Sequence, residues 1–196
     1  LEIKNDNYDD DEIWKQYFEN SKENVFKNSF LCQVGMIKSI RHKLDLDILR
    51  SHEIRSKIAA NYRAHSPYLN KIIYILKTQG KKTLMNNVKT QLELSNLVEN
   101  NDEYYLTDLD ILALSDYDHN MKIILFSNKN FNTMNSNINW LLMNKLTKDE
   151  IKDTEFYFIR AANYEEENLI PFYSFFETPK KLSEIDLINL ENYDEY

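Results

Sequence analysis

The hydrophobic residues change their spacing once along the chain, and this change constrains the fold most. Up to about residue 117 they recur every three or four positions, which is the spacing of helices that bury one face. From residue 122 onward they form short apolar runs separated by polar and proline-containing segments, a pattern typical of strands. Helices followed by strands predict an α+β fold, in which helices pack around a small mixed sheet.

The same pattern gives the expected elements. Helices are predicted over 11–27, 30–44, 46–62, 68–76, 84–97 and 107–117, and strands over 122–126, 155–159 and 172–176. Thr107 is expected to cap the last of these helices, with Asp110 at its third position completing a capping box. The strand at 122–126 is apolar on both faces, and we therefore expect it to be the central strand.

The composition sets limits on partners. A chain of 196 residues that is 42% apolar can bury a sizeable core, and its net charge of −8 repels phosphate backbones. We therefore do not expect a nucleic acid as partner. The local cations are interpreted as solvated helix and turn surface. They are Lys38, Arg41, His42, Lys43, Lys81 and Lys82.

Location and origin are also expectations at this stage. One cysteine cannot form an internal disulfide, and no apolar run approaches the roughly 18 residues of a membrane span. The acidic start lacks the features of a signal peptide and an initiating methionine, so we expect a cytoplasmic domain of a longer protein with no membrane partner. The abundance of Asn, Lys and Ile is typical of AT-rich genomes, such as those of some large DNA viruses, intracellular bacteria or protists.

Metal ions and cofactors are not expected. The segments 42–47 and 51–53 contain histidines and acids but lack the dense spacing of metal ligands. The chain has two glycines and no glycine-rich phosphate-binding motif.

Several segments resemble, in order and spacing, the motifs of ovarian tumour (OTU) family cysteine proteases. Gly35-Met-Ile-Lys-Ser-Ile40 resembles the segment at the start of the catalytic helix, and Glu53-Ile-Arg55 resembles a motif of the next helix. Residues 110–115 followed by 122–126 are similar to the family's helix and strand pair, and residues 156–159 followed by Asn163-Tyr164 resemble the closing strand with its histidine and aromatic residue. The resemblance spans about residues 30–165. It implies an acidic lead and N-terminal helix over 1–28, an OTU-like domain over 29–178 and a tail over 179–196.

The chain departs from this family at the positions that carry the chemistry. Gly35 occupies the nucleophile position, Asn163 the position of the general base, and Cys32 the position of the acid that precedes the nucleophile by three residues. Glycine has no side chain that attacks a carbonyl, and an amide does not accept a proton near neutral pH. Thiolate catalysis needs nucleophile, base and orienting group together. The resemblance therefore implies a pseudo-deubiquitinase, which serves as a protein-binding or scaffolding module.

In this family the surface around the catalytic site receives the C-terminal tail of ubiquitin. The resemblance therefore implies a binding surface near Gly35, Met36, Asn163 and Tyr164, beside the Asn-rich loop 128–139. Ubiquitin, or another protein that has taken its place, is the expected partner. Exposed aromatic residues of the C-terminal strands are expected to contribute to such a surface.

Two alternatives remain open. Cys32 could serve as the nucleophile of an active deubiquitinase-type peptidase, with His42 as an unusual base, or it could be a small buried apolar residue beside Phe30, Leu31 and Val34. Alternatively, the chain is a purely structural helical domain unrelated to the family.

Overall fold

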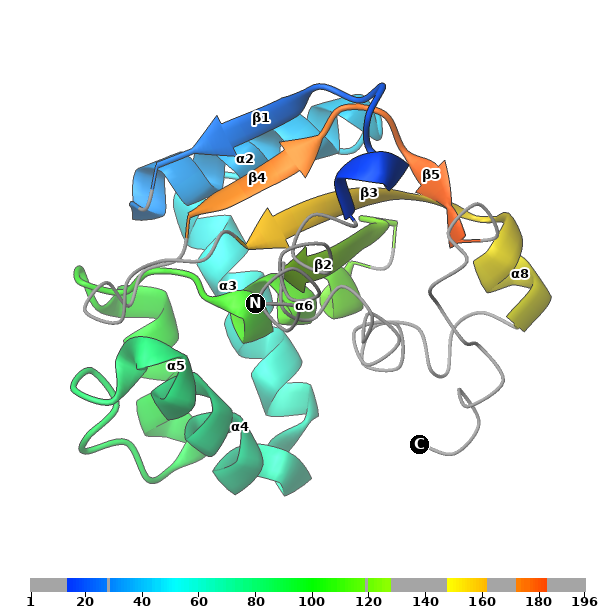
Figure 1. Ribbon diagram of the computed structural model, residues 1–196. Coiled ribbons are helices and arrows are strands. Elements are labelled where there is room, and N and C mark those ends of the chain that lie inside the picture. The colour runs from blue at the N-terminus through cyan, green and yellow to red at the C-terminus, as the bar shows by residue number, and fades with distance from the viewer. Residues whose placement is uncertain (1–13, 28, 119, 128–147, 162–171, 183–196) are drawn as a thin grey trace, which may run out of the picture. The chain divides into compact units, whose positions relative to one another are not determined.

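The computed structural model describes residues 14–27, 29–118, 120–127, 148–161 and 172–182, and it is an α+β protein, as predicted (Figure 1). These residues belong to two compact units. The first, called here the helical unit, comprises Phe26–Met121 and, among the other described residues, Phe172. The second, called the sheet unit, combines the described residues up to Val25 with those from Lys122 onward other than Phe172.

The helical unit contains five α-helices and two short irregular helical turns. They are α2 (Phe30–Lys43), α3 (Ser51–Ala64), the 3₁₀ turn η1 (Ser66–Tyr68), α4 (Leu69–Leu76), the π turn η2 (Lys77–Lys81), α5 (Gln91–Asn100) and α6 (Asp108–Tyr117). Helix α3 packs against both α5 and α6 and so forms the centre of this unit. Its inward residues Ile54, Ile58 and Tyr62 are fully buried.

Polar side chains fix where these helices begin. Ser29 accepts a hydrogen bond from the backbone amide of Cys32, and Thr90 accepts one from the amide of Glu93. Thr107 and Asp110 form the predicted capping box of α6, in which each side chain accepts from the other residue's backbone amide.

The chain turns sharply after α4. Gly80 has a φ of 99°, a backbone conformation that side chains with a Cβ disfavour. The predicted break at this glycine is confirmed. Helix α5 begins at Gln91, later than the predicted start at residue 84, because residues 82–87, with Asn86 and Asn87, form turns before Thr90 provides a cap.

Besides a short helical segment at residues 14–17, the described residues of the sheet unit form five strands and one short helix. They are β1 (Glu23–Phe26), β2 (Ile123–Ser127), α8 (Lys148–Asp153), β3 (Glu155–Ala161), β4 (Tyr173–Phe176) and β5 (Lys180–Lys181). The strand order is β1-β4-β3-β2, and β5 pairs with the beginning of β3. Strands β2 and β3 run parallel, with Ile123 opposite Tyr157, whereas β4 is antiparallel to β3, with Ile159 opposite Phe175.

Two predictions about this sheet are wrong. Within the described residues β2 pairs only with β3 and is the last strand of the order, so β3 rather than β2 is central. The apolar residues on both faces of β2 had predicted a central strand. The two faces of β2 are indeed buried, but an edge strand can also be covered on both faces. The predicted helix over 11–27 is interrupted, because residues 23–26 form β1 beside β4. Strand pairing here overrides a weak helical pattern.

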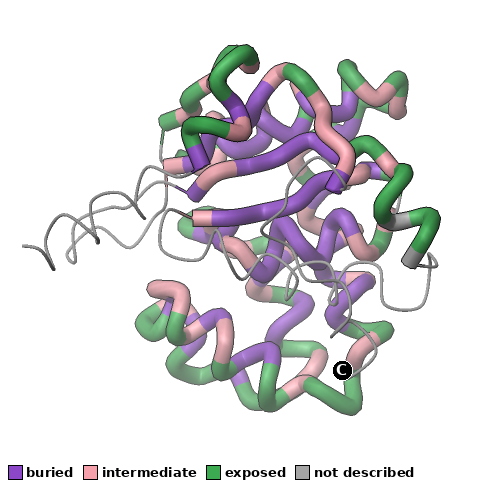
Figure 2. The backbone as a smooth tube through the Cα atoms, turned by 45° about the vertical axis from the view of Figure 1, so that its right-hand side comes forward, coloured by how far each residue is buried: buried purple, intermediate pink, exposed green. Residues whose placement is uncertain are grey.

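One face of the sheet carries a cluster of aromatic rings. Phe18 stacks on Phe176 at 4.2 Å and on Phe126 at 5.6 Å between ring centroids. Trp14 packs against the same two strand residues, and Arg160 lies 4.6 Å from the Trp14 ring. The alternate residues of β3 and β4 are buried as well (Figure 2). The predicted exposed aromatic face of these strands is therefore wrong for the described residues.

Candidate functional site

The structure places the predicted binding residues differently from expectation. Helix α2 begins at Phe30, so Gly35 is its sixth residue and does not lie at the helix start. Met36 is fully buried, so its prediction as a contact residue is wrong. Asn163, Tyr164 and the loop 128–139 lie outside the described residues.

Cys32 lies in the first turn of α2 and is half-buried, so the alternative of a fully buried cysteine is wrong. His42 follows ten residues later on the same helix. At about 1.5 Å per residue, the two are separated by about 15 Å along the helix axis. His42 is too far from Cys32 to act as its base.

Two cations that were expected on the surface are buried, which corrects that prediction. Lys81 is fully buried and forms an ion pair with Asp110, and Arg41 donates to Asp118 at 2.6 Å. The Lys81 ammonium also contacts the Tyr104 hydroxyl at 3.1 Å. The apolar stem of Lys81 can be buried like other aliphatic groups, and the Asp110 carboxylate beside the ammonium compensates its charge.

Asp110 is the centre of this buried cluster. It accepts hydrogen bonds from the hydroxyls of Tyr62 and Tyr104, both at 2.7 Å, and from the backbone amide of Thr107. Burial is the main cause that lowers the pKa of Lys81 and raises the pKa values of Tyr62 and Tyr104 well above 10.

Such shifted pKa values often mark a functional site, but this cluster is closed to a substrate. Lys81 and Asp110 are both fully buried, and Tyr62 and Tyr104 are at most 1% exposed. Their polar groups are bonded to one another. The cluster therefore joins α3, η2 and the start of α6 as a structural element.

The Glu53-Ile-Arg55 motif also has a structural role. Glu53 accepts from the backbone amide of Arg50 at 3.0 Å and so caps α3. Arg55 donates to the carbonyls of Val98 at 2.6 Å and Asn101 at 2.5 Å, which closes the C-terminal end of α5. Each residue satisfies backbone groups at a helix end.

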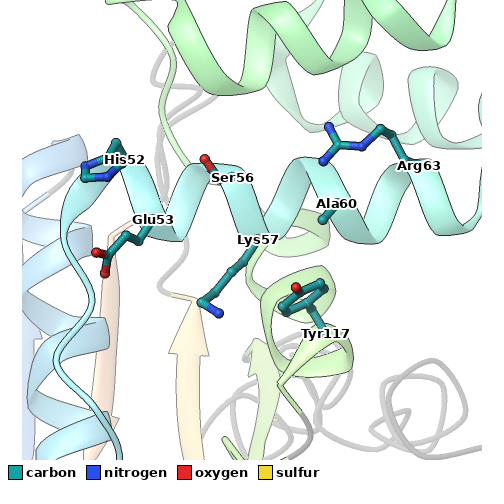
Figure 3. Close-up of a pocket in the computed structure, with 7 residues that line it drawn as sticks. All are labelled: His52, Glu53, Ser56, Lys57, Ala60, Arg63 and Tyr117. Atoms are coloured by element: carbon teal, nitrogen blue, oxygen red, sulfur yellow. The ribbon is translucent and has the colours of Figure 1, made fainter.

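An open groove lies along the exposed face of α3, with a volume of about 440 Å³ (Figure 3). It is lined by His52, Glu53, Ser56, Lys57, Ala60 and Arg63 of α3 and by Tyr117 of α6. Figure 3 shows Lys57 and Tyr117 on one side of the α3 axis and Ser56 and Arg63 on the other. The Lys57 ammonium lies 5.0 Å from the centre of the Tyr117 ring.

The groove places an exposed tyrosine ring beside a lysine ammonium. Within the described part of the chain, no hydrogen bond joins His52 to Ser56, and Glu53 is engaged in capping α3. A serine hydroxyl needs a bonded base to become a nucleophile. An exposed aromatic ring beside cations is common at protein interfaces.

The sequence analysis missed this groove. The polar face of α3 is visible in the sequence, but a helix with one polar face is ordinary. Only the contact between α3 and α6 brings Tyr117 to this face.

Comparison with known proteins gives no match to a family model, to a curated protein or to a solved structure. Within the described ranges, none of the helices combines the length and apolar character needed to cross a membrane. The same ranges contain no group of three or more potential metal ligands from His, Cys, Asp and Glu.

Proposed function

We propose that this chain is a non-catalytic, cytoplasmic protein-binding domain. The observation that carries the proposal is the open groove on α3, which is lined by Lys57, by the 47% exposed Tyr117 and by Arg63, whose present partner is Glu99. Tyrosine and arginine are frequent anchors of protein interfaces. The ionisable residues of the cluster around Asp110, by contrast, are buried and bonded to one another.

We further propose that the domain is a degenerate relative of OTU proteases, with ubiquitin or a substitute protein as its partner. The order of elements supports this, because α6 is followed directly by β2 and β2 lies beside β3. The position of Gly35 inside α2 does not support it. On this proposal Gly35 and Asn163 stand at the two lost catalytic positions.

Ubiquitin reagents test the absence of catalysis. The chain is incubated with ubiquitin chains and with a ubiquitin suicide probe, and binding of monoubiquitin is followed by calorimetry. We expect neither cleavage nor a covalent adduct, because neither Gly35 nor Asn163 can take part in acyl transfer. Sustained cleavage of the chains would refute the proposal.

A cysteine peptidase that uses Cys32 is the second candidate. One observation favours it: Cys32 is partly accessible in the first turn of a 14-residue helix. Its base would have to be a residue other than His42. Cleavage that disappears in the variant Cys32→Ala would establish this candidate.

A further inference from the structure

We propose that the outer face of α4 binds a short acidic segment of another protein. The binding surface is a row of four residues spaced by three positions, Tyr68, Lys71, Tyr74 and Lys77, called here the α4 stripe. The α4 stripe lies outside the α3 groove, so this inference goes beyond the proposed function and does not depend on it.

The α4 stripe belongs to a stretch of chain that contains no acid. Between Glu53 and Glu93 there is no aspartate or glutamate, but there are eight lysines and arginines, although the whole chain has a net charge of −8. The structure describes every residue of this stretch, which includes most of α3 and all of η1, α4 and η2. Its positive charge is therefore not balanced by acids that are close in sequence.

Four of these eight cations already contact a partner within the helical unit. They are Arg55, Arg63, Lys57 and Lys81. The other four form no ion pair with the residues that the structure describes. They are Lys71, Lys77, Lys82 and Lys89, of which Lys77 is half-buried and the others are exposed. The charge of these four lysines therefore remains available to a ligand.

The geometry of the helix places the α4 stripe across the outer face of α4. The apolar face of this helix is buried. Residues three positions apart are neighbours on a helix surface, so Lys71 and Tyr74 lie side by side on the opposite face, with Tyr68 and Lys77 at either end of the row. The two tyrosines are 59% and 68% exposed. Tyrosines and lysines therefore alternate over about 14 Å of η1, α4 and the start of η2.

This alternation of ring and charge indicates the chemistry of the ligand. An extended segment of about four or five residues spans the α4 stripe. Carboxylates of the segment pair with Lys71 and Lys77, and an apolar side chain between the carboxylates packs on the exposed Tyr74 ring. Exposed ion pairs contribute little each and are screened by salt, so we expect weak binding that depends on salt and on both kinds of residue.

Two other anionic partners fit this face less well. A long nucleic acid strand continues beyond the α4 stripe and then meets a chain with 32 acids, which repel its phosphates. A lipid surface holds a helix through apolar side chains that insert among the lipids, but Ile72, Ile73 and Leu76 of α4 are buried in the helical unit. A short acidic segment has neither disadvantage.

Labelled peptides of about nine residues test the ligand class by fluorescence anisotropy at low salt. One peptide has glutamates on both sides of a central phenylalanine, the second has glutamine in place of every glutamate, and the third has lysine there. We expect the acidic peptide to bind at least about tenfold more tightly than the other two. Attraction to a chain of charge −8 would favour the lysine peptide, so an acidic preference requires a local site.

Two further probes test the other classes of anion. They are a single-stranded oligonucleotide of about 20 nucleotides and vesicles that contain phosphatidylserine. We expect both to bind more weakly than the acidic peptide.

Charge-matched variants test the location. Lys71→Gln combined with Lys77→Gln should weaken binding of the acidic peptide by about fivefold or more, and Tyr74→Ala by about threefold or more. The control combines Lys38→Gln with Lys43→Gln, which makes the same change in net charge at two exposed lysines of α2 and should alter the affinity by less than about twofold. Circular dichroism confirms that each variant is folded, and Lys71→Arg combined with Lys77→Arg should keep most of the affinity.

The inference is overturned if the acidic peptide does not bind at about 1 mM, or if any other probe binds as tightly as the acidic peptide. It is also overturned if the control variant weakens binding as much as the α4 variants do, or if the amide chemical shifts that change on binding lie outside residues 66–89. These outcomes do not affect the proposed function, which is tested by turnover of ubiquitin chains.

Discussion

Asp110 accepts hydrogen bonds from several segments of the helical unit and forms an ion pair with the Lys81 ammonium. Tyr62 reaches it from α3, Lys81 from η2, and Tyr104 and Thr107 from the chain that leads into α6. All of these side chains are buried, so water cannot replace a partner that is removed. The residues of the cluster therefore depend strongly on one another.

Asp110→Ala should destabilise the protein by about 3–5 kcal/mol, because it leaves the Lys81 ammonium buried without a counter-charge. Chemical denaturation measures the change in the free energy of unfolding. Asp102→Ala, at an exposed position, is the control and should alter this energy by less than about 0.5 kcal/mol. Equal effects of the two variants would show that the cluster is not the stabilising element described here.

The two buried tyrosines, Tyr62 and Tyr104, make the free energy of unfolding depend on pH in the alkaline range. Their pKa values are raised well above 10 by burial and by the nearby Asp110 charge. Above pH 10 the folded protein keeps both phenolic protons while the unfolded chain releases them, so the free energy of unfolding falls by about 1.4 kcal/mol per pH unit for each tyrosine. The pKa of Lys81 is lowered in the folded protein. Lys81 therefore makes the free energy of unfolding rise with pH, but only at pH values below its ordinary pKa of 10.5.

Denaturation curves at several pH values from 9 to 11 measure this dependence. Tyr62→Phe lowers stability at every pH through the lost hydrogen bond to Asp110, but it should also reduce the slope above pH 10. A slope identical to that of the unmodified protein would contradict the assignment of a raised pKa to Tyr62.

At the scale of single elements, α2 and η2 each contain one of the two glycines of the chain. A Cβ added at Gly35 would have no heavy atom within 4 Å, and this position is inside a helix. Gly80 instead has a φ of 99° at the turn after α4. The two glycines therefore have opposite conformational requirements.

Gly35→Ala should stabilise the protein by about 0.5–1 kcal/mol, because alanine has the higher helix propensity and meets no obstacle. Gly80→Ala should destabilise it, since its backbone conformation disfavours a Cβ. Thermal or chemical denaturation of both variants compares them directly. Destabilisation by Gly35→Ala would show that this glycine is needed for a close contact.

Helix α5 depends on a side chain from another helix at its C-terminal end. Arg55→Met keeps much of the apolar stem but removes the donors to the carbonyls of Val98 and Asn101, and should cost about 1–3 kcal/mol. Hydrogen exchange should accelerate for amides near residues 97–101. Amides near Thr90, whose cap is independent of Arg55, serve as the internal control.

Elements specified by local patterns could be predicted from the sequence, and elements specified by distant partners could not. The capping box of Thr107 and Asp110 lies within four residues, so it was predicted. The ion pair of Asp110 with Lys81 joins residues 29 positions apart, and no periodicity indicates it. Strand β1 is likewise defined by β4, which follows about 150 residues later. The groove was missed for the same reason, since Tyr117 reaches α3 only through tertiary packing.

At the scale of the whole molecule, the described part of the sheet unit combines a first stretch of chain before Phe26 with a second part after Met121. Its aromatic cluster joins Trp14 and Phe18 from the first stretch with Phe126, Phe158 and Phe176 from the second. The sheet unit therefore contains contacts between residues far apart in sequence, whereas the helices of the helical unit all lie within Phe26–Met121.

Phe18→Ala should destabilise the sheet unit by about 3–5 kcal/mol, because Phe18 is 3% exposed and stacks on rings of two strands. Near-ultraviolet circular dichroism and Trp14 fluorescence report on this cluster during denaturation. Tyr68→Ala, at an aromatic side chain that is 59% exposed, provides the comparison and should have little effect. A small effect of Phe18→Ala would indicate that the ring is not part of the core.

The split construction of the sheet unit also has a consequence for biosynthesis. Phe18 leaves the ribosome about 160 residues before Phe176, which is a delay of roughly 8–30 s at ordinary translation speeds. During this interval the nascent chain carries Trp14 and Phe18 without the strands that later cover them. A chaperone that binds aromatic segments of nascent chains would find its target around Trp14 and Phe18, and would be displaced when β4 emerges.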